Sequence, residues 1–306
     1  MTIRPTVRPR KSDDLRCIRI GAVDVYPLVQ LHYRVDPARF FPHVAEWPLD
    51  RDGWYWHEPY IESGALVIDM GGFLVRTPDR TILIDAGIGN GKTRPNPNFD
   101  SRDDAWLAHF THLGVSLEDV DTVLFTHLHV DHVGFATTWD GQRWAPTFPN
   151  ATYHTTAAEL DYWTSPAARS EMDRLGDYIS DSILPLAEAG VLEISPPDLV
   201  LSPHVRLLPA PGHTPGNVCV EVRSEGRRAV FAGDMIHHPL QLAFPHRSTD
   251  YCIDEDGATT AREHLLRGLG ADDLLFPAHF PDSIPGRVRP GADGGFHYDP
   301  EHGERV

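Results

Sequence analysis

The chain alternates short apolar runs with turn-forming residues, and most of these runs have the length and composition of β-strands. Residues 17–31 contain two such runs, and residues 65–70, 72–77 and 81–85 follow as β-rich segments separated by Gly, Pro and Asp. Runs joined in this way predict a meander of neighbouring strands. The later apolar runs predict further strands at residues 122–126, 205–208, 218–222, 229–232 and 274–276.

Four segments between these strands have the pattern of helices. Residues 101–113 place Trp106, Leu107 and Phe110 on one face of a predicted helix. The other predicted helices cover residues 155–165, 167–189 and 258–269. Strands dominate, and the helices are suited to covering outer faces. The order of elements therefore predicts an α/β protein with an αββα sandwich of layers.

Three segments lie outside this regular pattern. Residues 1–14 are basic and interrupted by proline, which predicts a flexible tail. Residues 37–60 are rich in proline and aromatic residues, and we interpret them as an N-terminal arm that packs on the body of the domain or on a partner subunit. From Pro281 onward the chain is rich in Gly and Pro, and we expect it to be irregular. Residues 15–306 are thus predicted to form one domain with an N-terminal extension.

Composition and charge narrow the class of partner. The chain has 306 residues, enough to bury a substantial core, and its 44 acidic against 27 basic residues give a formal net charge of -17. Nucleic acids and anionic membranes are negatively charged and bind best to positively charged protein surfaces, so neither is the expected main partner. The 3 cysteines are far apart, which favours reduced thiols. No signal peptide and no membrane-spanning run is recognisable, so we expect a cytoplasmic protein with a small-molecule substrate.

A dense cluster of ligand-type residues follows the predicted strand that ends at Thr126. His127, His129, Asp131 and His132 lie within six residues of one another. Imidazole and carboxylate groups together suit Zn²⁺ and other borderline metal ions. A lone histidine is most often structural, but a cluster of this density is difficult to explain as solvated surface. The segment therefore predicts a metal site.

Three later positions can complete such a site. His213 lies in a turn defined by Gly and Pro, Asp234 follows the strand predicted at 229–232, and His279 follows the strand predicted at 274–276. Each is weak evidence alone. Together they place every candidate ligand just after a strand, as a site along one edge of a sandwich requires.

The H-x-H-x-D-H segment and the three later motifs resemble the metallo-β-lactamase superfamily, whose fold is an αββα sandwich. The similarity covers roughly residues 65–279. The resemblance implies a dinuclear site in which one metal ion is held by His127, His129 and His213, the other by Asp131, His132 and His279, and both by a bridging Asp234. It also implies that Asp85 supports the site by orienting a ligand histidine.

The expected chemistry follows from two neighbouring cations. Metal ions about 3.5–4 Å apart can bind one hydroxide between them, because they lower the pKa of bound water from about 15.7 toward roughly 7. They also polarise the substrate oxygen, and Asp131 or Asp234 can then move a proton to the leaving group. Zn²⁺ is the expected metal, with Mn²⁺, Fe²⁺ or Co²⁺ as alternatives.

Within the superfamily, the chain is most similar to the group of N-acyl homoserine lactonases and methyl parathion hydrolases. Residues 147–151, residues 233–238 and the N-terminal arm carry this similarity. It implies a lactonase or related ester hydrolase, with phosphotriester hydrolysis and hydrolytic dehalogenation as alternatives, and it favours a homodimer. One departure is Asn217, where the lactonases have His. A metal-binding regulator without turnover is the non-enzymatic alternative.

Substrate-pocket candidates lie just beyond the bridging acid. They are His237, His238 and Gln241, and a polar loop explains them equally well. Trp54, Trp56 and Phe135 are candidates for apolar pocket walls, although core packing is the simpler role for each of them.

Residues 86–93 resemble the loose form of a phosphate-binding loop ending in Lys92-Thr93. Such a loop needs a helix that begins at the Lys-Thr pair, so that backbone amides can hold the phosphates. Pro95 and Pro97 follow at once and disfavour that helix. The segment is therefore better explained as a glycine-rich loop near the metal site.

Overall fold

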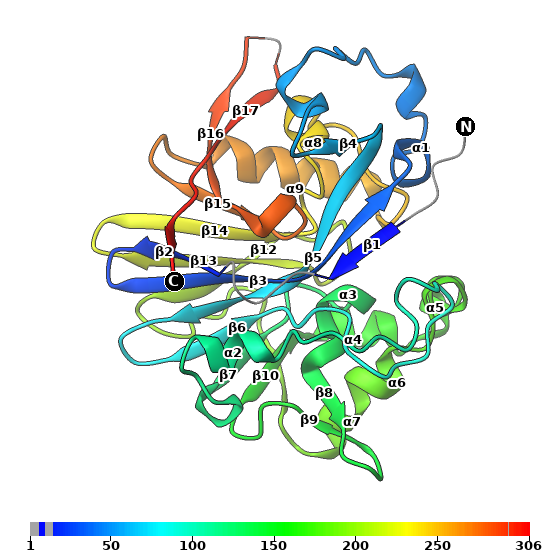
Figure 1. Ribbon diagram of the computed structural model, residues 1–306, viewed down its shortest axis with the longest axis vertical. Helices are drawn as coiled ribbons and strands as arrows, with labels where there is room; N and C mark the ends of the chain where they lie inside the picture. The colour runs from blue at the N-terminus through cyan, green and yellow to red at the C-terminus, as the bar shows by residue number, and fades with distance from the viewer. Residues whose placement is uncertain (1–5, 10–14, 293) are drawn as a thin grey trace.

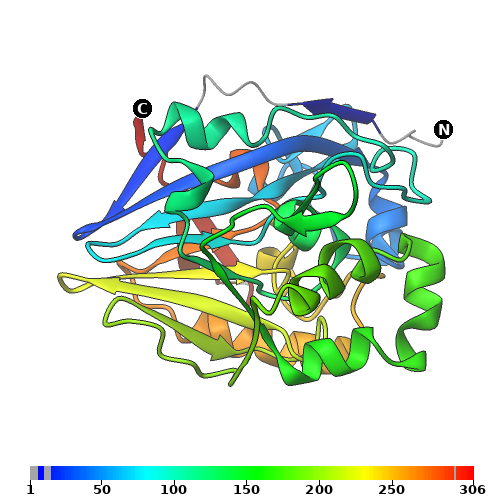
Figure 2. The same ribbon diagram turned by 90° about the horizontal axis from the view of Figure 1, so that it is seen from below.

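Two β-sheets lie face to face in the computed structural model, which describes residues 6–9, 15–292 and 294–306 (Figure 1). Helices cover the outer face of each sheet, so the predicted αββα arrangement is confirmed (Figure 2). Within the described residues, no helix is both long enough and apolar enough to cross a membrane.

The first sheet contains the N-terminal strands and the parallel strands that lead into the central loops. Its order is β11-β10-β7-β6-β5-β3-β2-β18, with β1 paired to β3 and β4 paired to β5. The strands β6, β7, β10 and β11 run parallel. The bounds are β1 Thr6–Pro9, β2 Arg16–Ile20, β3 Val23–Val35, β4 Ile61–Glu62, β5 Ala65–Arg76, β6 Thr81–Ile84, β7 Thr122–Leu124, β10 Thr152–Thr156, β11 Leu192–Ser195 and β18 Glu304–Arg305.

The second sheet follows the chain order from β12 to β17. Its strands β14 and β15 run parallel, and its other neighbouring pairs are antiparallel. The bounds are β12 Val205–Pro209, β13 Val218–Ser224, β14 Arg227–Gly233, β15 Leu274–Pro277, β16 Gly286–Pro290 and β17 Phe296–Pro300. A separate hairpin pairs β8 Thr137–Trp139 with β9 Trp144–Pro146.

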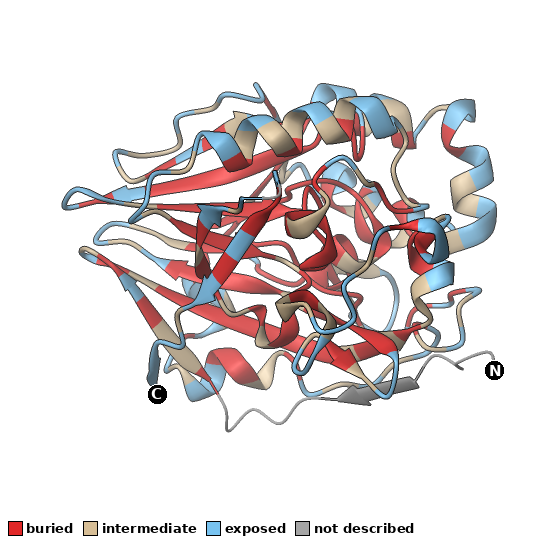
Figure 3. Cartoon of the chain, turned by 90° about the horizontal axis from the view of Figure 1, so that it is seen from above, coloured by how far each residue is buried: buried red, intermediate tan, exposed pale blue. Residues whose placement is uncertain are grey.

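The two sheets are held together by an apolar layer of alternating inward-facing residues (Figure 3). Phe73 of the first sheet packs against Phe231 and Phe276 of the second, with ring centroids 5.1 and 5.8 Å apart. All three rings are at most 3% exposed. Full burial of such a side chain contributes about 1.5–3 kcal/mol, so this layer is a main source of stability.

The helices form the two outer layers. Buried residues of α2, α4, α6 and α7 pack on the first sheet, and those of α8 and α9 pack mainly on the second. The bounds are α1 Pro37–Phe40, α2 Ala108–His112, α3 Val130–Val133, α4 Ala157–Trp163, α5 Arg169–Leu175, α6 Ile179–Ser182, α7 Leu184–Glu188, α8 Leu240–Ala243 and α9 Glu255–Arg267.

Two predicted helices are shorter than expected. The segment predicted as one helix over 167–189 is broken into α5, α6 and α7, because Gly176 adopts a positive φ of 96° at the end of α5 and Pro185 lies in the first turn of α7. Of the helix predicted at 101–113, only α2 is helical.

The two ends of the chain contain strands that the sequence did not predict. Thr6–Pro9 forms β1, while residues 1–5 and 10–14 of the predicted tail lie outside the described residues. The prediction of an irregular segment after Pro281 is wrong, because β16 and β17 form a hairpin. Phe296 and Tyr298 of this hairpin are buried in the apolar cluster beneath α8 and α9. Burial of these two side chains explains why the segment forms regular strands.

The N-terminal arm packs on the body of its own chain. It consists of α1, the short 3₁₀ helices Val44–Glu46 and Trp54–Trp56, and turns. Phe41 is fully buried and its ring lies 5.2 Å from that of Trp47, which is 5% exposed. The arm thereby covers one end of the sandwich, beside the loops that follow β14.

Candidate metal centre

The candidate ligands come from both sheets and meet where their strands end. His127 and His129 follow β7, and Asp131 and His132 lie in the single helical turn α3. The second sheet contributes His213 after β12, Asp234 after β14 and His279 after β15. The fold therefore brings all seven predicted ligands to one edge of the sandwich, and only Asp131 is more than 4% exposed.

Three histidines and one carboxylate oxygen form the first group. Nδ1 of His129 lies 3.0 Å from Nε2 of His127 and 2.9 Å from Nε2 of His213. Oδ2 of Asp234 lies 3.3 Å from Nε2 of His213 and 3.6 Å from Nε2 of His127. The four ligand atoms all lie within 4.8 Å of one another.

The second group surrounds the other oxygen of the same aspartate. Oδ1 of Asp234 lies 2.8 Å from Nε2 of His279 and 3.0 Å from Nε2 of His132. Oδ2 of Asp131 lies 3.8 and 3.9 Å from the same two nitrogens. Asp234 thus presents one oxygen to each group, as a bridging carboxylate does.

The ligand spacing fits divalent cations. Ligands of a tetrahedral zinc ion, at about 2.0–2.1 Å from the metal, lie ~3.3 Å from each other, close to the separations seen in both groups. Nε2 of His132 and Oδ1 of Asp234 are buried, and neither has a hydrogen-bond partner among the described residues. A buried polar atom without a partner is costly, and a cation between these atoms would satisfy both.

Outer partners fix which ring nitrogen carries the proton. Nδ1 of His279 donates to the carbonyl of Asp69 at 2.6 Å, and Nδ1 of His132 donates to Asp85 at 2.8 Å. Nδ1 of His127 lies 3.1 Å from the Thr126 hydroxyl, which itself donates to Asp85. In each neutral ring, Nε2 then presents a lone pair to the centre, as metal binding requires.

Burial favours the neutral form of two of the candidate ligand histidines. Burial, followed by the repulsion of neighbouring imidazoles, lowers the pKa of His127 and of His129 well below the ordinary value. A neutral imidazole has a free lone pair, so these two rings are ready to bind a cation.

Asp85 occupies the supporting position that the resemblance implied. Its Oδ2 accepts from His132, and both of its oxygens accept from Thr126, through the amide and the hydroxyl, at 2.8 Å each. Its backbone φ of 57° is left-handed, a conformation that Asp tolerates better than most residues. Asp85 therefore connects the end of β6 to the loop that carries four candidate ligands.

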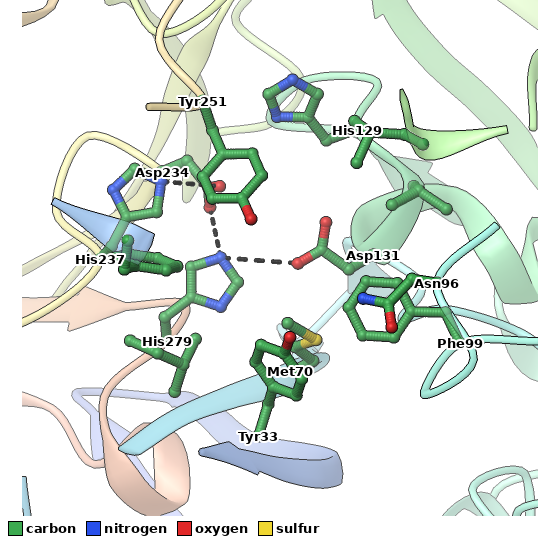
Figure 4. A pocket seen from close by; sticks show the side chains of 14 residues that line it. Tyr33, Met70, Asn96, Phe99, His129, Asp131, Asp234, His237, Tyr251 and His279 are labelled. Atoms are coloured by element: carbon green, nitrogen blue, oxygen red, sulfur yellow. Dashed lines mark ion pairs between the residues drawn. The ribbon is translucent and has the colours of Figure 1, made fainter. Parts of the chain in front are cut away.

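A pocket opens directly above the centre (Figure 4). Besides Asp131, Asp234 and the histidines, its walls include Tyr33, Phe40, Met70, Phe99, Leu175 and Tyr251. The hydroxyl of Tyr251 is turned toward the gap between Asp131 and Asp234 (Figure 4). Burial raises the pKa of Tyr251 to about 12, so this phenol keeps its proton at neutral pH. The pocket is mostly apolar, with hydrogen-bonding groups near its floor.

Of the three predicted pocket residues, only His237 lines this pocket. Its Nε2 is buried without a hydrogen bond and lies 3.1 Å from Oδ2 of Asp234. His238 instead bonds the carbonyl of Tyr60 through Nε2 and accepts from the amide of Leu240. Gln241 is a supporting residue, because its Oε1 accepts from the amide of His237 at 2.8 Å and lies 3.2 Å from Nδ1 of that ring.

The predicted aromatic walls lie elsewhere. Trp54 packs on Tyr55, Tyr60 and His297, and Trp56 lies beneath the guanidinium of Arg51. Phe135 stacks on Trp106 with centroids 4.7 Å apart. These three side chains have core or surface roles. The walls of the pocket come instead from β3, β5, α1, α5 and the loops beside them.

The glycine-rich loop at 86–93 has a structural role. Nζ of Lys92 bonds Thr137, Asp181 and Ser182, at distances of 2.9 to 3.1 Å, and lies 4.1 Å from the centre of the Trp144 ring. No helix begins at Thr93. Lys92 therefore fastens the loop to α6 instead of facing a phosphate.

Asn217 stabilises the loop that carries His213. Its side-chain amide donates to the carbonyl of Ala210 at 3.0 Å, which closes the loop that carries His213. The residue that departs from the lactonase pattern is thus buried in the ligand loop.

The chain belongs to the metallo-beta-lactamase superfamily, since residues 72–283 match the sequence profile of that family. With the fold and the convergent His and Asp residues described above, this membership assigns the chain to a superfamily of metal-dependent hydrolases. The resemblance inferred from the sequence is confirmed at this level.

Two kinds of sequence relative were found. The transcription termination factor FttA of Methanocaldococcus jannaschii is 37% identical over 83 residues, which are 27% of this chain and only 12% of that protein. The probable metallo-hydrolase Rv2300c of Mycobacterium tuberculosis is 29% identical over 239 residues, which are 68% of this chain and 74% of that protein.

The fold is also shared with solved structures. AidC, a dizinc quorum-quenching lactonase solved with N-hexanoyl-L-homoserine as product, has a TM-score of 0.76 at 23% identity, covering 94% of this chain and 97% of its own. The hydrolase AbOPH has a TM-score of 0.76 at 23% identity, covering 96% and 99%. At this identity, the comparison concerns the fold.

Proposed function

We propose that this protein is a dinuclear metal-dependent lactonase or related ester hydrolase acting on a small apolar substrate. The observation that supports it most strongly is the position of Asp234, which presents one oxygen to the group of His127 and its neighbours and the other to the group of His279. When bound, the two metal ions would supply a water molecule of lowered pKa and a Lewis acid for the substrate oxygen. Zn²⁺ fits the nitrogen-rich first group best.

The residues of the chain have distinct tasks in this proposal. His127, His129 and His213 would hold one ion, Asp131, His132 and His279 would hold the other, and Asp234 would contribute one oxygen to each. Asp131 and Asp234 also accept and return protons at the floor of the pocket. The phenol of Tyr251 donates a hydrogen bond to the substrate oxygen.

The pocket favours an apolar acyl or aryl group beside the reacting bond. Phe40, Phe99 and Met70 provide an apolar wall above the candidate ligands. A lactone or ester with such a group suits this surface. The acidic net charge of the chain adds a reason to propose a small molecule as substrate, in place of nucleic acid or membrane. A homodimer is proposed as the assembly only because of the resemblance of the sequence to the lactonase group.

The first test measures metal content and turnover on the same sample. Elemental analysis is expected to give about two ions per chain, and the sample is expected to open an N-acyl homoserine lactone. Removal of metal by a chelator should abolish turnover, and return of Zn²⁺ should restore it. A phosphotriester is assayed in parallel. If only the phosphotriester is turned over, the lactonase proposal is wrong and phosphotriester hydrolysis takes its place. A protein that takes up no metal would refute the metal centre.

The adjacent histidines provide a matched pair of variants. His237→Gln removes the ring nitrogen that lies 3.1 Å from Oδ2 of Asp234, and we expect kcat/KM to fall about 10- to 100-fold, the range for loss of a contact with a charged group. His238→Gln removes bonds that lie away from the centre, so its main effect should be a stability loss of about 1–3 kcal/mol. Steady-state kinetics and urea unfolding separate the two effects. Equal kinetic losses in both variants would contradict the assignment of His237.

A further inference from the structure

Glu159 is a buried carboxylate close to the candidate centre but outside the ligand set. It lies in the first turn of α4, and only 1% of the residue is exposed. Burial raises its pKa, while hydrogen bonds to its oxygens oppose that effect. Its oxygens accept hydrogen bonds from two backbone amides and from the indole of Trp163, and the Thr214 side chain also favours the anion.

The two oxygens of Glu159 connect both loops that carry the three-histidine group. Oε1 accepts from the amide of Leu128 at 3.0 Å, and Leu128 lies between the ligands His127 and His129. Oε2 accepts from the amide of Gly216 at 3.1 Å, three residues after His213. One carboxylate therefore bonds the backbone beside all three histidines of the first group.

The approach of the second loop depends on a glycine. A Cβ on Gly216 would lie 2.2 Å from Oγ1 of Thr156 and 2.5 Å from the amide nitrogen of Glu159. Only glycine lets the backbone come so close. Thr156, which also caps α4, donates to the carbonyl of Gly216 at 2.9 Å. The start of α4 and the loop of His213 are thus fitted together.

Glu159 also holds the ring that covers His129. Its Oε1 accepts from Nε1 of Trp163 at 3.2 Å, and the Trp163 ring lies 5.2 Å from the ring of His129. Nε2 of His129 is buried without a hydrogen bond. Unlike His132 and His279, this ligand has no acceptor behind it, so the orientation of its ring depends on packing against the indole.

We propose that Glu159 is a positioning residue for the three-histidine half of the metal centre. It sets the separation of the loops at 127–129 and 213–216 and the orientation of the His129 ring. This inference rests on the proposed two-metal site. It predicts that loss of the carboxylate weakens the metal ion held by His127, His129 and His213 more than the ion held by His132 and His279.

The test is the variant Glu159→Gln, assayed with Zn²⁺ and with Co²⁺. An amide presents an N–H group to one of the backbone N–H donors, so at least one loop contact is lost. Outer partners of metal ligands typically contribute 10- to 100-fold in affinity. We therefore expect chelator competition to show one ion bound 10- to 100-fold more weakly, and the visible spectrum of the Co²⁺ protein to change at that half of the site.

Glu221→Gln is the matched control. Glu221 is also a buried glutamate, 1% exposed, but it lies on β13 among Arg206, Arg223 and Arg228, away from the centre. This variant should lose stability while keeping the affinity of both ions and the Co²⁺ spectrum.

A milder variant covers the case in which Glu159→Gln does not fold. Trp163→Phe keeps a ring over His129 and removes only the indole donor, so the same ion should weaken by a smaller factor. The inference is overturned if the folded Glu159→Gln or Trp163→Phe protein holds both ions with unchanged affinity and spectrum. Failure of the wild-type protein to bind two ions would instead refute the proposed metal centre itself.

Discussion

The variant Asp234→Asn is expected to lower kcat/KM by on the order of 1,000-fold or more, about 4 kcal/mol of transition-state stabilisation. Asp234 presents one carboxylate oxygen to each group, Oδ2 toward His213 and Oδ1 toward His279. An asparagine keeps the shape but loses the negative charge and one oxygen. Both ions should therefore bind more weakly, and their shared position should be lost.

Metal content, kinetics and circular dichroism of the same preparation test this prediction. Asp272→Asn makes the same chemical change at an exposed turn before β15 and should leave metal content and turnover unaltered. An Asp234→Asn protein with about two bound ions and wild-type turnover would show that the carboxylate does not bridge.

Gly134→Ala is expected to destabilise the fold by about 3 kcal/mol, at the upper end of the usual range for overpacking. A Cβ at this position would lie 1.8 Å from the carbonyl carbon and oxygen of Ile88 and 2.3 Å from the amide nitrogen of Gly89. These are backbone atoms and have no rotamer to change. The segment after His132 is also bonded to the loop at 86–89, through the amide of Gly134 and the carbonyl of Gly87 at 2.7 Å.

Urea unfolding at equilibrium measures this effect. Gly270→Ala is the comparison, because its added Cβ would make only ordinary contacts of 3.5 Å or more, and its cost should stay within about 0.5 kcal/mol. A Gly134→Ala protein as stable as the Gly270→Ala protein would mean that the two loops can separate at little cost.

The ligand set could be predicted from the sequence because each ligand can be recognised from the residues beside it in the chain. Each candidate ligand directly follows an apolar strand, and the residue types are those that borderline metals select. Strand ends meet at one edge of a sandwich, so the positions of His213 and His279 relative to His129 follow from the fold once the fold is known.

The pocket could not be predicted in the same way. Tyr33, Phe99 and Tyr251 meet there through tertiary packing of segments far apart in the sequence, and none stands in a motif. Glu159 was missed because a glutamate in the first turn of a helix is ordinary; only the folded chain shows that Leu128 and Gly216 bond to it. The hairpin of β16 and β17 was missed because Gly and Pro at strand ends resemble those of a loop.

The division of the ligands between the two sheets has a consequence for the lifetime of the protein. The first sheet supplies His127, His129, Asp131 and His132, while loops of the second supply His213, Asp234 and His279. Bound ions would therefore link the two layers. A free metal concentration 100 times the dissociation constant would raise the free energy of unfolding by about 2.7 kcal/mol. In a cell, scarcity of metal would remove this added stability and leave a larger fraction of the chain unfolded and open to proteases, so the abundance of the protein is expected to fall when the metal is scarce.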